Sequence, residues 1–436
     1  MFTPQPRSGG GAGGDPGTAE RDEKQLLSLI EAGHEAFKKA AYVDALQKWT
    51  EACTIRERTL GPEHPDTARL LNAIGNVYNK LGKDQPALEF YSRALAIREK
   101  ELGPGHSETA RALSNCGIVR HKLGEFEAAL ECHGRALSIC ERSRSIGPDH
   151  PDMARSLCDA ADVYDDCGRY AEAMQCYRKA LGIQQKVLGS AHPDVARAVV
   201  GMANVSMHRG AYPRAKELYE KGLAIQERTL GCAHPATATT ITNCALAMEK
   251  LGETARAKEL HMQALEIQRE VFGRTHPDVA RTLSHLGQAH EASGDLVKAF
   301  ECHDEAYTIR ERTVGLDHPD TAYTLGRLGT VCRRRENYHK AMEYYHLAVA
   351  ISEKALGPDH PGTAVVVHNL GLVLLRVGEL QIAMRHFQRA IESIEGSFGA
   401  GHPFHARVRE SLQKCSDMME DRGTGGGGHR PVAAAS

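Results

Sequence analysis

The stretch LGPEHPDTAR, at Leu60–Arg69, decides the fold of this chain, because variants of it return along almost the whole sequence. Its histidine recurs at steps of 42 residues, with a single step of 44. The recurring histidines are His64, His106, His150, His192, His234, His276, His318, His360 and His402. A glycine stands three residues before each of them, and a proline follows eight of the nine. Self-similarity at a fixed period of this length predicts a protein built from stacked repeats.

Each unit between two such stretches has the pattern of two helices. In the second unit, Ala68, Leu71 and Ile74 follow one another at intervals of three residues, which is typical of one face of a helix. Gly82 interrupts this pattern, and a second run of the same kind follows in residues 87–97. Each helix is expected to have about 17 residues and a length of roughly 25 Å. No unit shows the alternating pattern of a β-strand, so we predict an all-α fold.

The recurring stretch also has the chemistry of a boundary between two helices. Gly61 suits the left-handed residue just past a helix C-terminus. Pro65 suits the first helical position, where its missing N–H removes no hydrogen bond, and Asp66 faces the positive end of the helix dipole. We expect the histidine to cap this junction. A metal site is disfavoured, because equivalent residues of stacked helices lie about 10 Å apart and cannot converge on one ion.

A second register runs inside every unit. A small residue is followed at offsets of 12, 16 and 19 residues by an alanine, a ring and another small residue, as in Gly75, Ala87, Tyr91 and Ala94. This register resembles the tetratricopeptide repeat. The 42-residue period with its Gly-x-x-His-Pro boundary is similar to the long-helix subtype of kinesin light chains and nephrocystin-type proteins. The resemblance implies a right-handed superhelical solenoid of nine helix-turn-helix repeats plus a C-terminal capping helix.

The same pattern sets the expected boundaries. Residues 1–22 and 422–436 are rich in glycine and lack apolar periodicity, so we expect disordered tails there. Residues 23–400 are expected to form the solenoid, and residues 403–421 a lone capping helix. The repeats are predicted at about 23–61, 65–103, 107–147, 151–189, 193–231, 235–273, 277–315, 319–357 and 361–399.

Composition excludes several classes of function. The formal net charge is only −2, which argues against a nucleic-acid reader or an electrostatic membrane binder. No apolar run approaches the roughly 18 residues of a membrane helix, so no membrane insertion is expected. The first 17 residues lack the apolar core of a secretory signal. The twelve cysteines contain no Cys-x-x-Cys pair, which favours a reducing, cytoplasmic location.

Signals for catalysis or a cofactor are weak, and we predict neither an enzyme nor a cofactor. The glycine runs at residues 9–14 and 425–428 lack the following Lys-Ser/Thr of a phosphate loop. Neither a Gly-x-Ser-x-Gly nor a His-Glu-x-x-His motif occurs. Cys158, Cys167 and Cys176 recur every nine residues, but buried packing is the expected role of such cysteines, with a redox switch as the alternative. His133, His261 and His303 occupy the ring position and are expected to fill the core.

In the family that the chain resembles, the first helix of each repeat lines a concave groove. The resemblance implies that its second position faces this groove, and here that position holds Arg69, Arg111, Arg155, Arg197, Thr239, Arg281 and Tyr323 in successive repeats. Further groove candidates are the amides Asn72, Asn76, Asn79 and Asn204, together with Lys80, His208, Arg333 and Arg334. Arginine favours carboxylates because its fork is planar and bidentate.

The alternative for these arginines is structural. Each of them can pair with an acid on a neighbouring helix, and a charged helix face is often only solvated. The fourth repeat favours this interpretation, because Asp162, Asp165 and Asp166 are expected on the same surface as the arginines.

The resulting functional prediction is a scaffold or adaptor in the cytoplasm. It would bind peptide segments of partner proteins, with acidic residues beside apolar anchors, in the groove. The alternative is an architectural component of a ciliary or microtubule-motor assembly that binds through its outer face. The sequence does not specify the partner or the oligomeric state.

Overall fold

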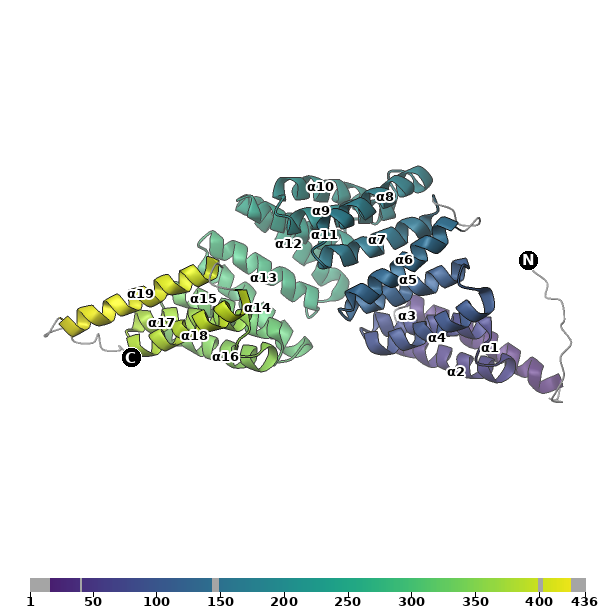
Figure 1. The fold of residues 1–436 in the computed structure, drawn as a ribbon, viewed down its shortest axis with the longest axis horizontal. Coiled ribbons are helices and arrows are strands. Elements are labelled where there is room, and N and C mark those ends of the chain that lie inside the picture. Colours follow the sequence, from purple (N-terminus) through teal and green to yellow (C-terminus); the bar gives the residue numbers. More distant parts are fainter. Residues whose placement is uncertain (1–15, 40, 143–148, 399–402, 425–436) are drawn as a thin grey trace. The chain divides into compact units, whose positions relative to one another are not determined.

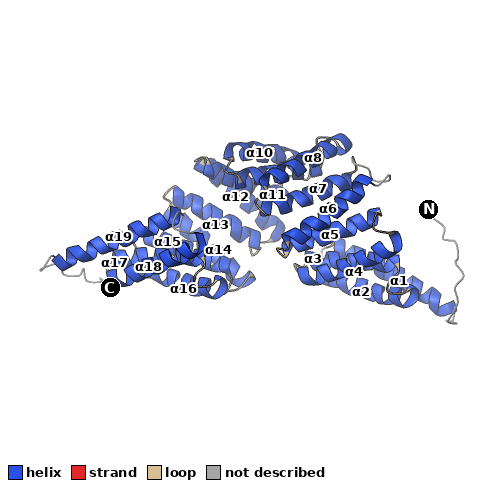
Figure 2. Ribbon diagram, in the orientation of Figure 1, coloured by secondary structure: helices blue, strands red, loops and turns tan. Residues whose placement is uncertain are grey.

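The computed structural model describes residues 16–39, 41–142, 149–398 and 403–424, and these residues form α-helices and no strand (Figures 1 and 2). The chain divides into two compact units, Met1–Ala211 and Tyr212–Ser436. Consecutive helices within each unit pack against each other in pairs, as expected for stacked repeats. The all-α solenoid predicted from the sequence is therefore confirmed. We call the first helix of each repeat its A helix and the second its B helix.

The first unit contains four complete repeats and the A helix of the fifth. Its helices are α1 (Pro16–Lys38), α2 (Tyr42–Leu60), α3 (Pro65–Lys80), α4 (Asp84–Leu102), α5 (Ser107–Lys122), α6 (Phe126–Arg142), α7 (Pro151–Asp166), α8 (Tyr170–Leu188) and α9 (Pro193–His208). The A helix α7 also contacts the A helices α5 and α9 of the adjacent repeats. The A helices α5, α7 and α9 therefore lie side by side in this unit.

The second unit begins with the B helix of the fifth repeat. Its helices are α10 (Tyr212–Thr229), α11 (Pro235–Lys250), α12 (Thr254–Phe272), α13 (Pro277–Ala292), α14 (Leu296–Thr313), α15 (Pro319–Arg334), α16 (Tyr338–Leu356), α17 (Pro361–Val377), α18 (Leu380–Phe398) and α19 (Pro403–Thr424). Here α11 contacts α13, and α17 contacts both α15 and α19. The predicted capping helix thus extends the A face of the second unit.

The two ends of the helical region differ slightly from the expected boundaries. Helix α1 begins at Pro16, so residues 16–22, which we expected in a tail, are helical. A proline at the first helical position and the helix-compatible residues after Gly17 account for this earlier start. Helix α19 likewise continues to Thr424. The rest of the predicted tails, residues 1–15 and 425–436, lies outside the described residues.

The two helices of a pair approach each other where a small residue faces a ring. A Cβ added to Gly75 would lie 2.7 Å from the ring of Tyr91, and one added to Gly371 would lie 2.6 Å from Phe387. The rings of Tyr91 and Phe387 are at most 1% exposed. His133, His261 and His303 fill the same ring position and are fully buried. The predicted register of small residues and rings is therefore confirmed.

The recurring histidine is the N-cap of each following A helix. In His64 the Nδ1 atom accepts a hydrogen bond from the backbone N–H of Asp66 at 3.2 Å. The same bond to the residue two positions later is made by His106, His150, His192, His234, His276, His318 and His360. The ninth, His402, lies outside the described residues. A ring nitrogen thus satisfies one of the free donors at a helix N-terminus, which confirms the capping role.

The junction glycines differ from the expected left-handed helical conformation. Gly61 has φ 97° and ψ 159°, and Gly357 has φ 96° and ψ 158°. These angles combine positive φ with an extended ψ, a region that essentially only glycine adopts. The prediction that the glycine ends the helix is confirmed, but the predicted conformation is wrong. A threonine that the sequence analysis overlooked closes the junction, since Thr67 Oγ1 donates to the Gly61 carbonyl at 3.0 Å.

Glu336 offers a test of the turn between the A and B helices. It has φ 62°, whereas the equivalent residue of the preceding repeat is Gly294 with φ 81°. A left-handed conformation costs a residue with a side chain about 1–2 kcal/mol. A new glycine also lowers stability by roughly 0.4–1 kcal/mol, because it increases the conformational entropy of the unfolded chain. Glu336→Gly should therefore raise the free energy of unfolding by about 0.5–1 kcal/mol in urea titrations of the full chain. Gly294→Glu, the matched reversal, should lower it, and stabilisation by both changes would contradict this account.

The histidine cap can be tested at His276, whose Nδ1 accepts from the Asp278 N–H at 3.2 Å. Loss of an N-cap acceptor typically costs about 1 kcal/mol. His276→Ala should lower the unfolding free energy by this amount, whereas His276→Asn should retain most of the stability because asparagine is itself a strong N-cap. Circular dichroism during urea denaturation compares the variants. Equal losses in both would show that the ring acts through packing instead.

Candidate functional site

The predicted groove arginines lie on the exposed side of the A helices, and their guanidinium groups are close to acids. Arg69 contacts Asp66 at 3.0 Å, and Arg281 contacts Asp278 at 3.0 Å. In both pairs the acid belongs to the first turn of the same helix, three residues before the arginine. The structural alternative is therefore correct in one respect, because these arginines have acidic partners. The partner is mostly on the arginine's own helix rather than on its neighbour.

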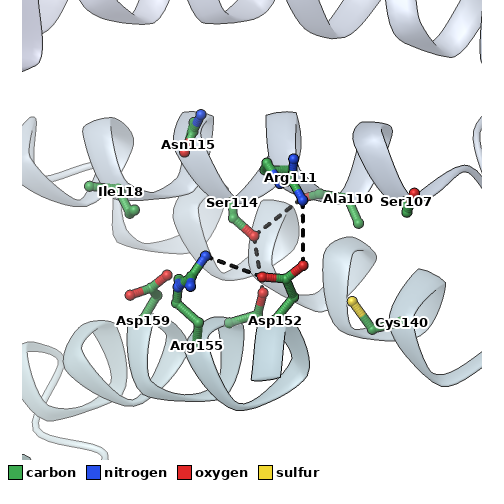
Figure 3. Close-up of a pocket in the computed structure, with 11 residues that line it drawn as sticks. Ser107, Ala110, Arg111, Ser114, Asn115, Ile118, Cys140, Asp152, Arg155 and Asp159 are labelled. Atoms are coloured by element: carbon green, nitrogen blue, oxygen red, sulfur yellow. Dashed lines mark hydrogen bonds and ion pairs between the residues drawn. The ribbon is translucent and has the colours of Figure 1, made fainter. Parts of the chain in front are cut away.

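Two of the arginines meet in a hollow between α5 and α7 (Figure 3). Arg155 donates to Asp152 at 3.2 Å, and Arg111 reaches the same carboxylate from the adjacent repeat at 3.6 Å. Arg111 also bonds Glu108 at 2.9 Å. Asp152 thus lies between two guanidinium groups, each of which has a side chain more than half exposed. This arrangement brings together two arginines that are 44 residues apart in the sequence.

The remaining lining of this hollow consists mostly of small or polar residues. The hydroxyls of Ser114 and Ser156 lie 3.1 Å apart across the two helices, and Asn115, Asp159 and Ile118 also line the wall. The cavity volume is about 50 Å³. Because pockets for cofactors and drug-sized ligands measure about 300–1,000 Å³, this hollow can accept the tip of one side chain but no cofactor. Sequence analysis missed both serines, since nothing in their spacing distinguishes them from other helical serines.

Arg197 has a different environment from the other arginines. It donates to Asp159 at 2.6 Å and to Asp162 at 3.0 Å, both on the A helix of the preceding repeat. Asp159 is only 6% exposed. Burial lowers the pKa of the Arg197 guanidinium, but Asp159 and Asp162 outweigh it and raise this pKa above its ordinary value. Arg197 therefore forms a salt bridge between adjacent repeats and neutralises a buried carboxylate.

The other acids of the fourth repeat are also bonded to neighbouring helices. Asp165 lies 2.9 Å from His208 on α9, and Asp166 lies 2.7 Å from His121 on α5. Burial raises the pKa of Asp165, and the contact with His208 partly offsets this increase. The predicted gathering of acids on α7 is present. These acids hold α7 to its two neighbours.

The predicted groove amides also have partners. Asn115 donates to Asn72 at 2.8 Å, and Asn76 accepts from the Tyr91 hydroxyl at 2.6 Å. Asn204 interacts with a neighbouring group as well. In the second unit, Arg334 donates to the backbone carbonyl of Glu291 at 2.7 Å. The first unit therefore brings Arg111 and Arg155 into one hollow, while Arg69 and the amides lie along the same face outside it.

No group of three histidine, cysteine or acidic side chains is placed to hold a metal ion within the described residues. None of the described helices combines the length and apolar character needed to span a bilayer.

Comparison with known proteins identifies the repeat. A tetratricopeptide repeat model matches residues 36–100, 87–142, 194–270, 249–312, 278–345 and 320–396, and a second model of the same description matches residues 153–194. The chain belongs to the tetratricopeptide repeat family. The family resemblance inferred from the small-residue and ring register is thereby confirmed. No curated protein sequence matches this tetratricopeptide repeat chain significantly.

Several solved structures are similar. A putative kinesin light chain with nearly identical repeats from Podosopora anserina is 28% identical, covers 48% of this chain and 98% of its own length, and has a TM-score of 0.43. The apo form of RapI is 18% identical over 66% of this chain and 98% of its own, with a TM-score of 0.52. A signal-transduction ATPase with a tetratricopeptide repeat sensor from Pyrococcus horikoshii is 13% identical over 90% of this chain and 55% of its own, with a TM-score of 0.63. The last two show the fold alone.

The difference between Arg197 and Arg155 can be measured as stability. Arg197→Ala leaves the buried Asp159 carboxylate unpaired and should lower the unfolding free energy by about 1–3 kcal/mol. Arg155→Ala removes only an exposed pair and should cost less than about 0.5–1 kcal/mol. Adding Asp159→Asn to Arg197→Ala should recover part of the loss, because a neutral amide costs less to bury than an unpaired charge. Urea denaturation of the four proteins provides the comparison, and equal effects of the two alanine substitutions would exclude a structural role specific to Arg197.

Proposed function

We propose that this chain docks a peptide segment of a partner protein along the exposed face of its A helices. Its tetratricopeptide repeats support a role as a protein-interaction scaffold in general, and an all-α repeat array of this kind is typically not an enzyme. The observation that carries the finer proposal is the hollow between α5 and α7, where Arg111 and Arg155 share Asp152 (Figure 3). The partner would be a segment with acidic side chains beside one or two apolar anchors.

The weakness of the internal ion pairs supports an acidic ligand. Exposed pairs such as Arg155–Asp152 contribute only about 0–1 kcal/mol to stability. An incoming carboxylate can therefore replace Asp152 as the partner of Arg155 at little cost. The internal pair still favours an orientation of the guanidinium toward the hollow before the ligand arrives, and such preorganisation reduces the entropy lost on binding. The small cavity volume fits a single carboxylate from the peptide.

A second candidate uses the B helices instead. A broader hollow of about 750 Å³ lies between α12 and α14, and Met262 on its wall is 57% exposed. This surface supports the alternative of a component in a ciliary or microtubule-motor assembly that binds through its outer face. We also propose a cytoplasmic location for either role, and its support is that all twelve cysteines are free thiols.

The groove proposal is tested by charge reversal that leaves Arg197 intact. The double substitution Arg111→Glu plus Arg155→Glu should weaken the binding of acidic partner peptides. The control is Arg178→Glu plus Lys179→Glu on the B helix α8, which changes the net charge by the same amount. Affinity capture from cell extract, followed by mass spectrometry and binding assays with peptides from the captured proteins, compares both variants with the wild type. We expect at least a tenfold loss of affinity in the groove variant only. Partners that the groove variant retains but a Met262→Glu variant loses would support binding through the outer face.

A further inference from the structure

A second hollow on the A face of the second unit has a different charge. It lies between α15, α17 and α19 and has a volume of about 220 Å³. Four cationic side chains line it, together with one carboxylate, one hydroxyl and two leucines. These residues are Arg333, Arg376, Arg407, Lys414, Glu410, Ser411, Leu372 and Leu375. Four positive charges against one negative charge leave a local net charge of +3, in a chain whose total is only −2. We call these eight residues the basic pocket.

The cations of the basic pocket lack the partners that the groove arginines have. Arg69, Arg155 and Arg281 each lie within 3.2 Å of an acid. By contrast, no carboxylate of the described residues lies within 4.0 Å of the four cations Arg333, Arg376, Arg407 and Lys414. Glu410 also forms no ion pair with any described residue. Arg407 lies 5.8 Å from the centre of the Phe404 ring, but no acid of the described residues neutralises the four cations, so their charge can attract an anionic ligand.

A buried histidine contacts one residue of the basic pocket. His368 on α17 is 2% exposed, and its Nε2 atom lies 3.0 Å from the Ser411 hydroxyl. Burial, followed by the nearby Arg407 and Arg333, lowers the pKa of His368 to about 4. The histidine is thus neutral at pH 7 and holds Ser411 in place. The Nε atom of Arg333 is buried and has no hydrogen-bond partner among the described residues.

We propose that the basic pocket binds the phosphoryl group of a phosphoserine or phosphothreonine in a partner protein. A phosphoryl group carries a charge of about −1.5 to −2 and three acceptor oxygens, so it can bond several cations from three helices at once. A single carboxylate has two oxygens and one charge and would leave most of this pocket uncompensated. The volume suits one such group, and the partly exposed Leu372 offers an apolar surface to its neighbouring side chain. Clusters of arginine are a general means of phosphopeptide recognition.

The inference does not rest on the groove proposal, because the two sites share no residue and belong to different units. The probes are three immobilised peptide pools with randomised flanks around a central phosphoserine, serine or glutamate. The full-length chain is compared with Arg376→Glu plus Arg407→Glu, whose side chains are both exposed. The control is Arg385→Glu plus Arg409→Glu, exposed residues outside the pocket that change the net charge equally. Circular dichroism confirms that the variants fold.

We expect the wild type to retain the phosphoserine pool at least tenfold better than the serine and glutamate pools. Inorganic phosphate at millimolar concentration should compete. The pocket variant should lose this preference, whereas the control and the Arg111→Glu plus Arg155→Glu variant should keep it. Equal retention of the glutamate pool would overturn the phosphoryl assignment, as would equal loss in the pocket and control variants. Tighter binding of a single-stranded oligonucleotide that depends on the same arginines would also overturn it.

Discussion

The close contact between a small residue and a ring is the constraint on which the rest of the structure depends. Gly75 and Gly371 leave no room for a side chain, so the two helices of a pair can approach until a ring fills the space between them. Tyr177 extends this contact to the next repeat, where it lies against Gly201. Because the buried rings fix how far apart the helices lie, they also fix the spacing of the A helices. Side chains on the A helices of adjacent repeats are thereby brought within reach of one another, as Arg111 and Asp152 are.

The boundary between repeats uses one acid for two purposes. Asp66, Asp152 and Asp278 follow the capping histidine in the first helical turn, where a negative charge is favourable, and each also bonds the arginine three residues later. Ala236 and Gly362 replace this acid in the sixth and ninth repeats, and Thr239 and Val365 replace the arginine there. In this chain, the arginine at this position occurs only where the acid precedes it. Much of the apparent arginine ladder is thus explained by helix starts. The ligand contact that we propose depends on the further geometry found between α5 and α7.

Local signals made the fold predictable, and long-range contacts limited the prediction of the site. Periodicity, the Gly-x-x-His-Pro boundary and the ring register each depend on residues close in sequence, so the helices, the caps and the buried histidines could all be inferred. The extended ψ of Gly61 was missed because many helices end in a left-handed glycine. The tie between Arg197 and Asp159 joins residues 38 apart and depends on how adjacent repeats pack. The basic pocket was missed for the same reason, since α19 lies outside the repeat register and contributes Arg407 and Lys414.

The hollow between α5 and α7 and the basic pocket differ in how their charges are compensated, and this difference bears on which of them is selective. Where Arg155 already has Asp152, a ligand carboxylate exchanges one weak pair for another, so affinity there has to come largely from apolar anchors and shape. In the basic pocket four cations repel one another and only Glu410 offsets them, so an anion gains their attraction without displacing an internal partner. Electrostatic complementarity of this kind contributes mainly to specificity and to the rate of association. A partner that carries a phosphoryl group would therefore be selected by the basic pocket of the second unit.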